Sequence, residues 1–167
     1  MKVSYFWSLL LMLLVGACRQ RMEHRFAKSF ELMPAAELLL EDSSTMINTK
    51  AITKDLPVVI TYVSCDCEHC QAQAQALSGN ARLLTGVRLL LVTNSPPTEL
   101  REFCKVANVR PADNFVAGSD LGFKLYGALK IKQYPSTYIY DERGQFLKLY
   151  LGEVDVRRII ETLKATK

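Results

Sequence analysis

The segment 58-VVITYVSCDCEHCQ-71 places an unbroken apolar run directly before a cluster of three cysteines. Residues 58–63 are of types that favour strands, and the lack of polar alternation is typical of a strand buried on both faces. Residues 67–77 are mostly good helix formers, and Gly79 follows as a helix stop. The sequence therefore predicts a buried strand that leads into a helix, with the cysteines at the junction.

Cys67-Glu68-His69-Cys70 is a C-x-x-C motif in a strand-to-helix context. Residues three apart in the first turn of a helix share a face, so the two sulfurs can reach bonding distance. The N-terminus of a helix stabilises a thiolate in its first turn, here that of Cys67, by up to about 2 kcal/mol. A protonated His69 would add to this effect and Glu68 would oppose it. We therefore predict that Cys67 attacks a partner disulfide and that Cys70, one turn further in, resolves the mixed disulfide.

An inert structural disulfide is the alternative for this pair. It is disfavoured because closing so short a loop removes little entropy from the unfolded chain.

Strand and helix patterns alternate along the rest of the chain. Short strands are expected at 30–32, 36–40 and 45–48, and further strands at 87–93, 114–117, 136–140 and 146–151. Helices are expected from Asn94 onward, at 121–129 and at 156–163. From Val58 onward the order is β-α-β-α-β-α-β-β-α, and 141-DERG-144 is typical of a hairpin turn. This order predicts an α/β fold, a mixed central sheet with helices on both faces.

In the helix from Asn94, four residues recur at the spacing of one apolar face: Leu100, Phe103, Cys104 and Ala107. Cys104 is therefore predicted to be a core residue.

The first motif, followed much later by 132-KQYPSTYIYDERGQ-145, resembles thioredoxin-fold proteins, in particular the TlpA-like, or redoxin, branch (AhpC/TSA-related) of exported bacterial lipoproteins. The resemblance covers about residues 29–166. It implies a thioredoxin-like fold and disulfide exchange without a bound cofactor or metal. It also implies a cis bond before Pro135, beside the dithiol, and a Tyr134 backbone that binds an extended substrate.

The sequence departs from this family at four positions. Thioredoxin carries a buried acid six residues before its first motif cysteine, where this chain has Thr61. Several TlpA-like reductases carry a glutamate three residues after the second cysteine, where this chain has Gln73. Asp66 replaces the usual aromatic residue before the motif. Cys65 is an additional thiol, interpreted as a strand-end residue or as an alternative disulfide or metal contact.

The N-terminus predicts export. Lys2 precedes an apolar stretch at 3–15, and 15-VGAC-18 resembles the bacterial lipobox, in which the cysteine is lipidated. We expect a lipoprotein signal peptide at 1–17, a basic tether at 18–28 and a thioredoxin-like domain at 29–167. A lipid on Cys18 would anchor the protein to a bacterial membrane of the cell envelope, facing the periplasm.

The charge pattern of the chain indicates which classes of partner to expect. The net charge is +4, but no basic block contains interleaved aromatic residues, so no nucleic-acid partner is expected. We predict a membrane-anchored protein-disulfide oxidoreductase with protein clients and an upstream redox partner. The residues leave the direction of electron flow open.

Two other functions are compatible with parts of the motif. Cysteines of 65–70 and His69 could bind copper or zinc, as in a metal chaperone, but adjacent ligands converge poorly and the only other histidine, His24, lies in the tether. A peroxiredoxin-like peroxidase needs Pro-x-x-x-Thr/Ser-x-x-Cys. Ser64 fits this pattern, whereas Ile60 occupies the proline position.

Overall fold

The computed structural model describes residues 31–110 and 112–165. The predicted signal peptide, tether and lipidated Cys18 lie outside these residues. Within them, no helix is both long and apolar enough to cross a bilayer.

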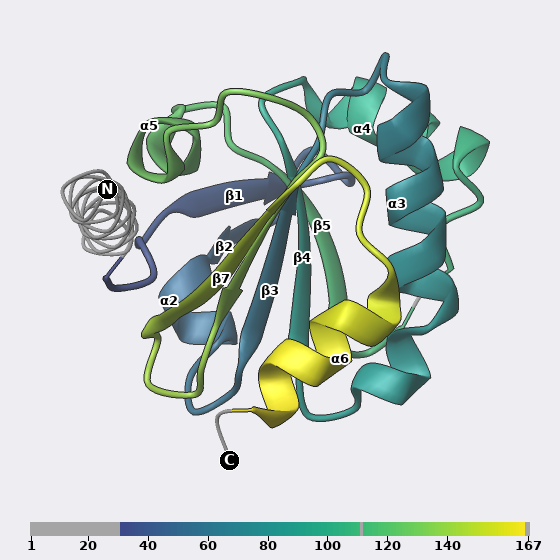
Figure 1. Cartoon of the computed structure of the whole chain (residues 1–167). Coiled ribbons are helices and arrows are strands. Elements are labelled where there is room, and N and C mark those ends of the chain that lie inside the picture. Colours follow the sequence, from purple (N-terminus) through teal and green to yellow (C-terminus); the bar gives the residue numbers. More distant parts are fainter. Residues whose placement is uncertain (1–30, 111, 166–167) are drawn as a thin grey trace, which may run out of the picture. The chain divides into compact units, whose positions relative to one another are not determined.

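Seven strands form one mixed sheet (Figure 1). They are β1 (Glu37–Leu40), β2 (Met46–Asn48), β3 (Val58–Tyr62), β4 (Arg88–Thr93), β5 (Phe115–Ser119), β6 (Ser136–Tyr140) and β7 (Phe146–Leu151). The order across the sheet is β2-β1-β5-β4-β3-β6-β7, in which β3 pairs with β4 and β4 with β5 in parallel and the other pairs are antiparallel. The motif-bearing β3 therefore lies inside the sheet, with β4 on one side and β6 on the other.

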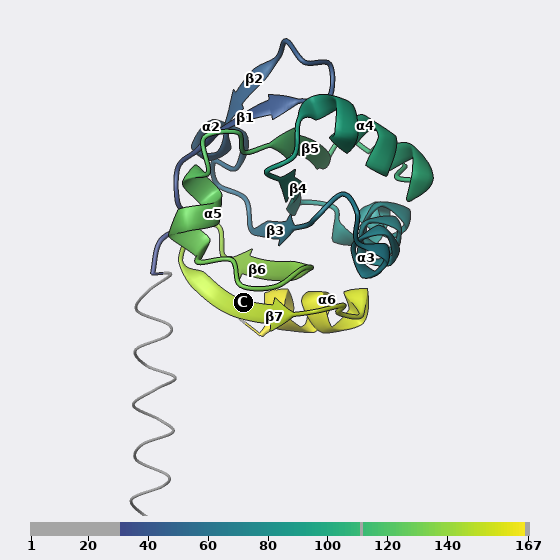
Figure 2. The same cartoon turned by 90° about the horizontal axis from the view of Figure 1, so that it is seen from above.

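Helices cover both faces of this sheet (Figure 2). They are α2 (Thr49–Ile52), α3 (Glu68–Gly79), α4 (Pro97–Val106), α5 (Lys124–Leu129) and α6 (Val156–Lys164), with a short 3-10 helix at Ala81–Leu84. Side chains of α3, α4 and α6 pack on the sheet face that carries Val59 and Val63. On the other face Tyr138 donates its hydroxyl to the Leu129 carbonyl at 2.7 Å, which ties α5 to β6. The predicted mixed sheet with helices on both faces is confirmed.

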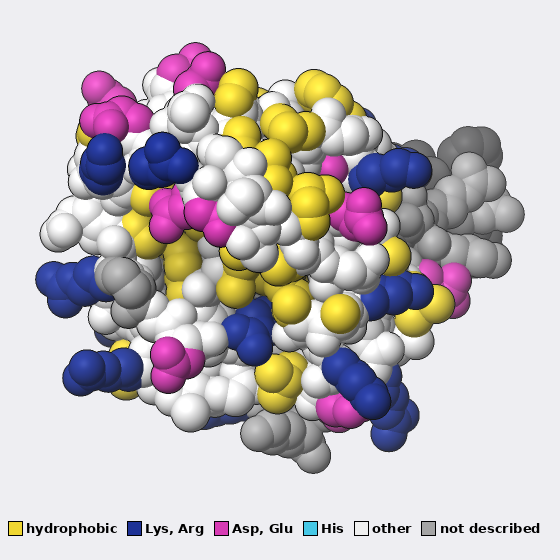
Figure 3. Space-filling model, turned by 180° about the vertical axis from the view of Figure 1, so that it is seen from behind, with side chains coloured by type: hydrophobic (Ala, Val, Ile, Leu, Met, Phe, Trp, Pro, Cys, Tyr) yellow, Lys and Arg dark blue, Asp and Glu magenta, His cyan; other side chains and the backbone are white. Residues whose placement is uncertain are grey.

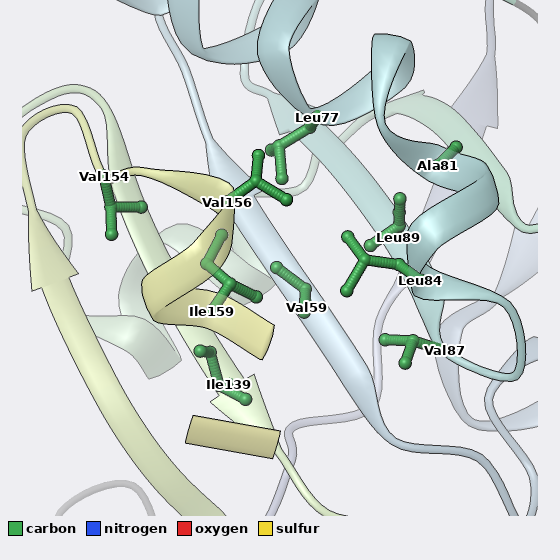
Figure 4. Close-up of a cluster of buried hydrophobic side chains, with 10 residues drawn as sticks. All are labelled: Val59, Leu77, Ala81, Leu84, Val87, Leu89, Ile139, Val154, Val156 and Ile159. Atoms are coloured by element: carbon green, nitrogen blue, oxygen red, sulfur yellow. The ribbon is translucent and has the colours of Figure 1, made fainter. Parts of the chain in front are cut away.

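The core on the α3 side consists of two clusters of buried hydrophobic side chains. The first joins β3, β4 and β6 to α3 and α6, and Figure 4 labels its members: Val59, Leu77, Ala81, Leu84, Val87, Leu89, Ile139, Val154, Val156 and Ile159. The second lies under the first half of α3 and under α4: Val63, Cys70, Ala74, Leu91, Leu100, Phe103 and Ala107. We call this second group the thiol-side cluster, because Cys70 belongs to it. The thiol-side cluster thus holds the start of α3, and the first cluster holds its C-terminal end.

Several element boundaries differ from the sequence prediction. Leu32 makes only an isolated bridge to Gln145 rather than belonging to a strand. The α5 helix begins at Lys124, not Leu121, because Phe123 adopts a left-handed φ of 53° and the Asp120 carboxylate accepts the Lys124 N–H at 2.9 Å. The α2 and 3-10 helices were not predicted, since four residues are too few to establish a helical period.

Some hydrophobic surface remains exposed. Seen from behind, the molecule carries hydrophobic side chains grouped on one face, with charged side chains of both signs around them (Figure 3). Val106, the last residue of α4, is 60% exposed.

Candidate active site

The C-x-x-C motif lies where β3 gives way to α3. After β3 the chain turns, and the Cys67 N–H donates to the Ser64 carbonyl at 3.4 Å. Cys67 is the N-cap of α3, with an extended backbone, and its Sγ accepts the Cys70 N–H at 3.2 Å. The sulfur of Cys67 is therefore held at the end of the helix where backbone N–H groups favour negative charge.

The two motif thiols differ in exposure. Cys67 is half-buried, whereas Cys70 is fully buried in the thiol-side cluster. Burial raises the pKa of the Cys70 thiol, and its hydrogen bond to Cys67 raises it further. Both residues are free thiols in this structure. An accessible sulfur thus lies beside an inner sulfur that binds its proton tightly.

The loop before β6 lies against the motif. The register pairs Tyr62 with Ser136, so the end of β3 and the start of β6 are neighbours. The Tyr134–Pro135 bond is cis, as the resemblance implied. The Tyr134 ring packs against the thiol-side cluster, with its centroid 6.3 Å from that of Tyr62. Partial burial, followed by the influence of Tyr126, raises the pKa of Tyr134.

A second loop, between β7 and α6, joins these two segments through three consecutive residues. The Gly152 N–H donates to the Pro135 carbonyl at 2.8 Å, and Gly152 has a φ of 80°. The Glu153 Oε1 lies 2.5 Å from the His69 Nδ1. The Val154 N–H donates to the Gln73 Oε1 at 2.7 Å. The 152–154 loop therefore connects the Pro135 loop, the motif and the first turns of α3.

Sequence reasoning missed the 152–154 loop. Gly152 lies between a strand and a helix N-cap residue, a position at which a glycine signals a turn and carries no information on the partners of that turn. No local pattern could show what Glu153 contacts, because it lies 84 positions after His69.

The positions that lack the family's carboxylates hold buried neutral side chains. The Thr61 hydroxyl, fully buried, lies 3.1 Å from the Thr137 hydroxyl on β6. Gln73 is 2% exposed, and within the described part of the chain its Nε2 makes no hydrogen bond. Both side chains thus have structural partners, and neither can accept a proton near neutral pH.

The charged residues next to the motif cysteines are exposed. Glu68 and His69 occupy the outer side of the first turn of α3. The Asp66 carboxylate accepts a hydrogen bond from the Ser64 hydroxyl, which holds the pKa of Asp66 below its usual value. Asp66 therefore keeps its negative charge beside Cys67 at neutral pH.

The remaining two cysteines lie against the same cluster. The Cys65 Sγ is 3.7 Å from the Thr93 hydroxyl at the end of β4. Cys104 is only partly buried, so the predicted core position is at the edge of the core. Burial, with smaller contributions from Glu41 and Cys65, raises the pKa of Cys104 to about 12. Cys104 is thus a poor nucleophile at neutral pH.

The arrangement of potential metal ligands bears on the metal-chaperone alternative. Across residues 31–110 and 112–165, no three side chains of Cys, His, Asp or Glu are grouped so that they could hold a metal ion.

The comparison with protein families decides the assignment. Residues 25–147, more than half of the chain, match the AhpC/TSA family. The chain belongs to the AhpC/TSA family. No curated protein sequence matches it.

Solved structures share the fold of this AhpC/TSA-family chain at low sequence identity. Peroxidoxin BcpB from Mycobacterium tuberculosis has a TM-score of 0.68 at 15% identity, covering 82% of this chain and 96% of that one. StoA from Bacillus subtilis has a TM-score of 0.62 at 14% identity, covering 77% and 95%. The exposed lipoprotein thioredoxin Etrx1 from Streptococcus pneumoniae has a TM-score of 0.63 at 20% identity, covering 78% and 98%. These similarities establish the thioredoxin-like fold.

Proposed function

We propose that this AhpC/TSA-family protein is a thiol-disulfide oxidoreductase that exchanges disulfides with client proteins through Cys67 and Cys70. The observation that carries the proposal is the pairing of a half-buried Cys67 sulfur at the N-cap of α3 with a fully buried Cys70 one turn behind it. A structural disulfide would not require one of its sulfurs to remain partly accessible beside the Pro135 loop.

The reaction proceeds in two exchanges. The Cys67 thiolate attacks one sulfur of a client disulfide; the client S–S bond breaks, a mixed disulfide forms and the other client sulfur leaves as a thiolate. Cys70 then loses its proton and attacks the Cys67 Sγ. The Cys67–Cys70 disulfide forms and the second client sulfur leaves. The client is reduced by two electrons and the dithiol is oxidised by two; run backward, the same steps oxidise a client dithiol.

The neighbouring loops support binding of a polypeptide. Tyr134 and Pro135 lie beside the motif, and the Gly152 N–H holds the Pro135 carbonyl in place. An extended client segment could pair with backbone groups of Tyr134 while its sulfur reaches Cys67. Glu68 and His69, exposed on the first turn of α3, would face such a client.

The cellular setting is part of the proposal. We infer that a lipid on Cys18 anchors the protein to a bacterial membrane with its redox domain in the periplasm, where an upstream redox partner resets the dithiol. Export into an oxidising compartment fits a chain that carries a dithiol as its reactive group. Cell fractionation with a Cys18→Ser variant tests this: release from the membrane pellet supports the anchor, and unchanged sedimentation contradicts it.

Client trapping tests the exchange reaction. In a Cys70→Ser protein the mixed disulfide on Cys67 cannot be resolved, so client adducts should accumulate and be identifiable by mass spectrometry. The matched control is the Cys67→Ser/Cys70→Ser double variant, which should trap nothing. Equal adducts in both variants would contradict the assignment.

A peroxidase function is the second candidate, because the chain's family and the fold of a peroxidoxin are both compatible with it. Ile60, buried in β3, stands where the peroxidase pattern requires proline. Peroxide consumption with a thiol donor, measured beside disulfide reduction on the same preparation, separates the two. Peroxide turnover that far exceeds disulfide exchange would favour the peroxidase.

A further inference from the structure

A hollow of about 580 Å³ opens beside the motif, between the turn after β3 and helix α4. Asp66, next to Cys67 in the chain, contributes to one wall, and Glu99, Glu102, Phe103 and Val106 of α4 contribute to the other. Tyr134 joins the hollow to the Pro135 loop. A polypeptide whose sulfur reaches Cys67 therefore has a place for its neighbouring residues beside the motif.

The lining of this hollow is acidic. Three of its residues are carboxylates, Asp66, Glu99 and Glu102, and no lysine, arginine or histidine contributes to it. The Ser64 hydroxyl holds the pKa of Asp66 below its usual value, so that this carboxylate is charged at neutral pH. The chain as a whole carries a net charge of +4. Residues 1–30, which contain five basic residues and one acidic residue, account for this charge. The remaining residues are close to neutral overall, so the three carboxylates make the hollow more acidic than the rest of the domain.

One lysine lies near the edge of the hollow. The Lys105 Nζ is 3.4 Å from the Glu102 carboxylate, and both side chains are about two-thirds exposed. An ion pair this exposed is weak, and solvent screens it. Glu102 can therefore exchange this contact for one with a bound cation, and Lys105 does not cancel the charge of Asp66 and Glu99.

Apolar side chains complete the hollow. Phe103 is buried, Tyr134 is half-buried and Val106 is 60% exposed. A small ion would gain nothing from these surfaces. The remaining lining residues include polar side chains such as Ser64 and Asn94. Lysine and arginine side chains have apolar stems and charged ends, so they match a hollow that offers apolar surfaces together with exposed carboxylates.

We propose that this hollow selects clients with lysine or arginine beside the reactive disulfide, in an extended segment. The inference rests on the proposed exchange reaction and names its substrate class. The chemistry is unchanged: Cys67 attacks the client disulfide, and the hollow holds the residues next to it. Carboxylates near an exposed surface act mainly by accelerating encounter, so the selectivity should appear in the second-order rate and should weaken with salt.

The experiment measures the rate at which the reduced protein reduces two peptides. Both contain the same disulfide-bonded cysteine pair, flanked in one by lysines and in the other by glutamates. At low ionic strength we expect the lysine peptide to react about tenfold faster, within the range that electrostatic steering produces. The ratio should fall toward one as added salt reduces the Debye length to about 3 Å near 1 M.

Two charge-reversed variants locate the effect. Glu99→Lys/Glu102→Lys should reduce the ratio to one or below. Glu142→Lys/Glu161→Lys changes the net charge equally at exposed positions outside the hollow and should keep most of the preference. Circular dichroism confirms that both variants fold. If both lose the preference equally, or if the native protein treats the peptides alike, the inference is wrong.

A neutral small disulfide, 2-hydroxyethyl disulfide, separates this inference from the reaction on which it rests. The Glu142→Lys/Glu161→Lys variant should reduce it at the native rate, and Glu99→Lys/Glu102→Lys should change its reduction far less than that of the lysine peptide. If the native protein reduces neither it nor the peptides, the exchange function and this inference both fail. If it reduces all three disulfides at equal rates, the exchange function stands and only the selectivity is contradicted.

Discussion

The His69 Nδ1 lies 2.5 Å from the Glu153 Oε1, although the two residues are 84 positions apart. His69 lies between the two motif cysteines in sequence, so the sequence alone suggests that its imidazole affects only the Cys67 thiolate. Instead a carboxylate from the 152–154 loop lies against it. The loop after β7 therefore contributes to the electrostatic environment of the dithiol, together with charged residues that are close to the cysteines in sequence.

Removing this carboxylate should make the dithiol more oxidising. Glu153→Gln removes a negative charge beside His69 of the motif. Loss of this charge stabilises the Cys67 thiolate, and therefore the reduced form of the protein. Because both side chains are largely exposed, the reduction potential should rise by only about 10 to 20 mV. Equilibration with a glutathione redox buffer measures the shift. Glu142→Gln, on the distant β6–β7 turn, is the control, and equal potentials for the two variants would contradict the role of Glu153.

The four described cysteines should differ sharply in reactivity. Brief treatment of the reduced protein with iodoacetamide at pH 8 should modify Cys67 first, because its sulfur is accessible at a helix N-terminus. Cys70 is fully buried. Cys104, with a pKa of about 12, is thiolate in only roughly one molecule in ten thousand at this pH. Peptide mapping by mass spectrometry gives the order, and faster labelling of Cys104 or Cys65 would reverse the assignment.

Resolution of a mixed disulfide should be slow at neutral pH. Cys70 must lose its proton before it attacks, and burial raises its pKa, so the rate should increase about tenfold per pH unit while pH remains below that value. Decay of a Cys67 mixed disulfide with a model peptide from about pH 6 to 9 measures this. A flat profile would show that another group takes the proton.

Restoring a carboxylate at position 73 should accelerate that step near pH 7. Gln73→Glu keeps an oxygen to accept the Val154 N–H and puts a second oxygen where the Nε2 has no partner among the described residues. A buried carboxyl has a raised pKa and can act as a base near neutrality. Gln75→Glu, exposed on the same helix, is the control. Identical decay rates for the two variants would show that the absence of a carboxylate at position 73 does not limit the resolving step.

The Thr61–Thr137 contact should contribute to stability as a pair. Thr61→Val leaves the buried Thr137 hydroxyl without its partner, at a cost of about 1 to 3 kcal/mol in the free energy of unfolding. Thr137→Val should cost a similar amount. The double variant removes both polar groups and should cost less than the sum. Urea unfolding of the four proteins measures the coupling, and strict additivity would show that the hydroxyls do not interact.

The sequence by itself determined the features that depend on neighbouring residues. The apolar run predicted a strand at 58–63, and β3 spans Val58–Tyr62; the helix predicted at 67–77 is α3, Glu68–Gly79. The hairpin of β6 and β7 followed from two strand patterns around a turn. Such features are readable because backbone propensity, side-chain period and capping act within a few positions.

The tertiary structure alone decided which distant side chains meet at the site. The pairing of β3 with β6 places Thr61 beside Thr137, and the return of the chain after β7 brings Glu153 to His69 and Val154 to Gln73. The acidic hollow likewise needs α4 packed beside the turn after β3. These contacts depend on sheet register and on helix packing over the shared core. Both are determined by many weak interactions between distant parts of the chain, so no short stretch of sequence predicts them.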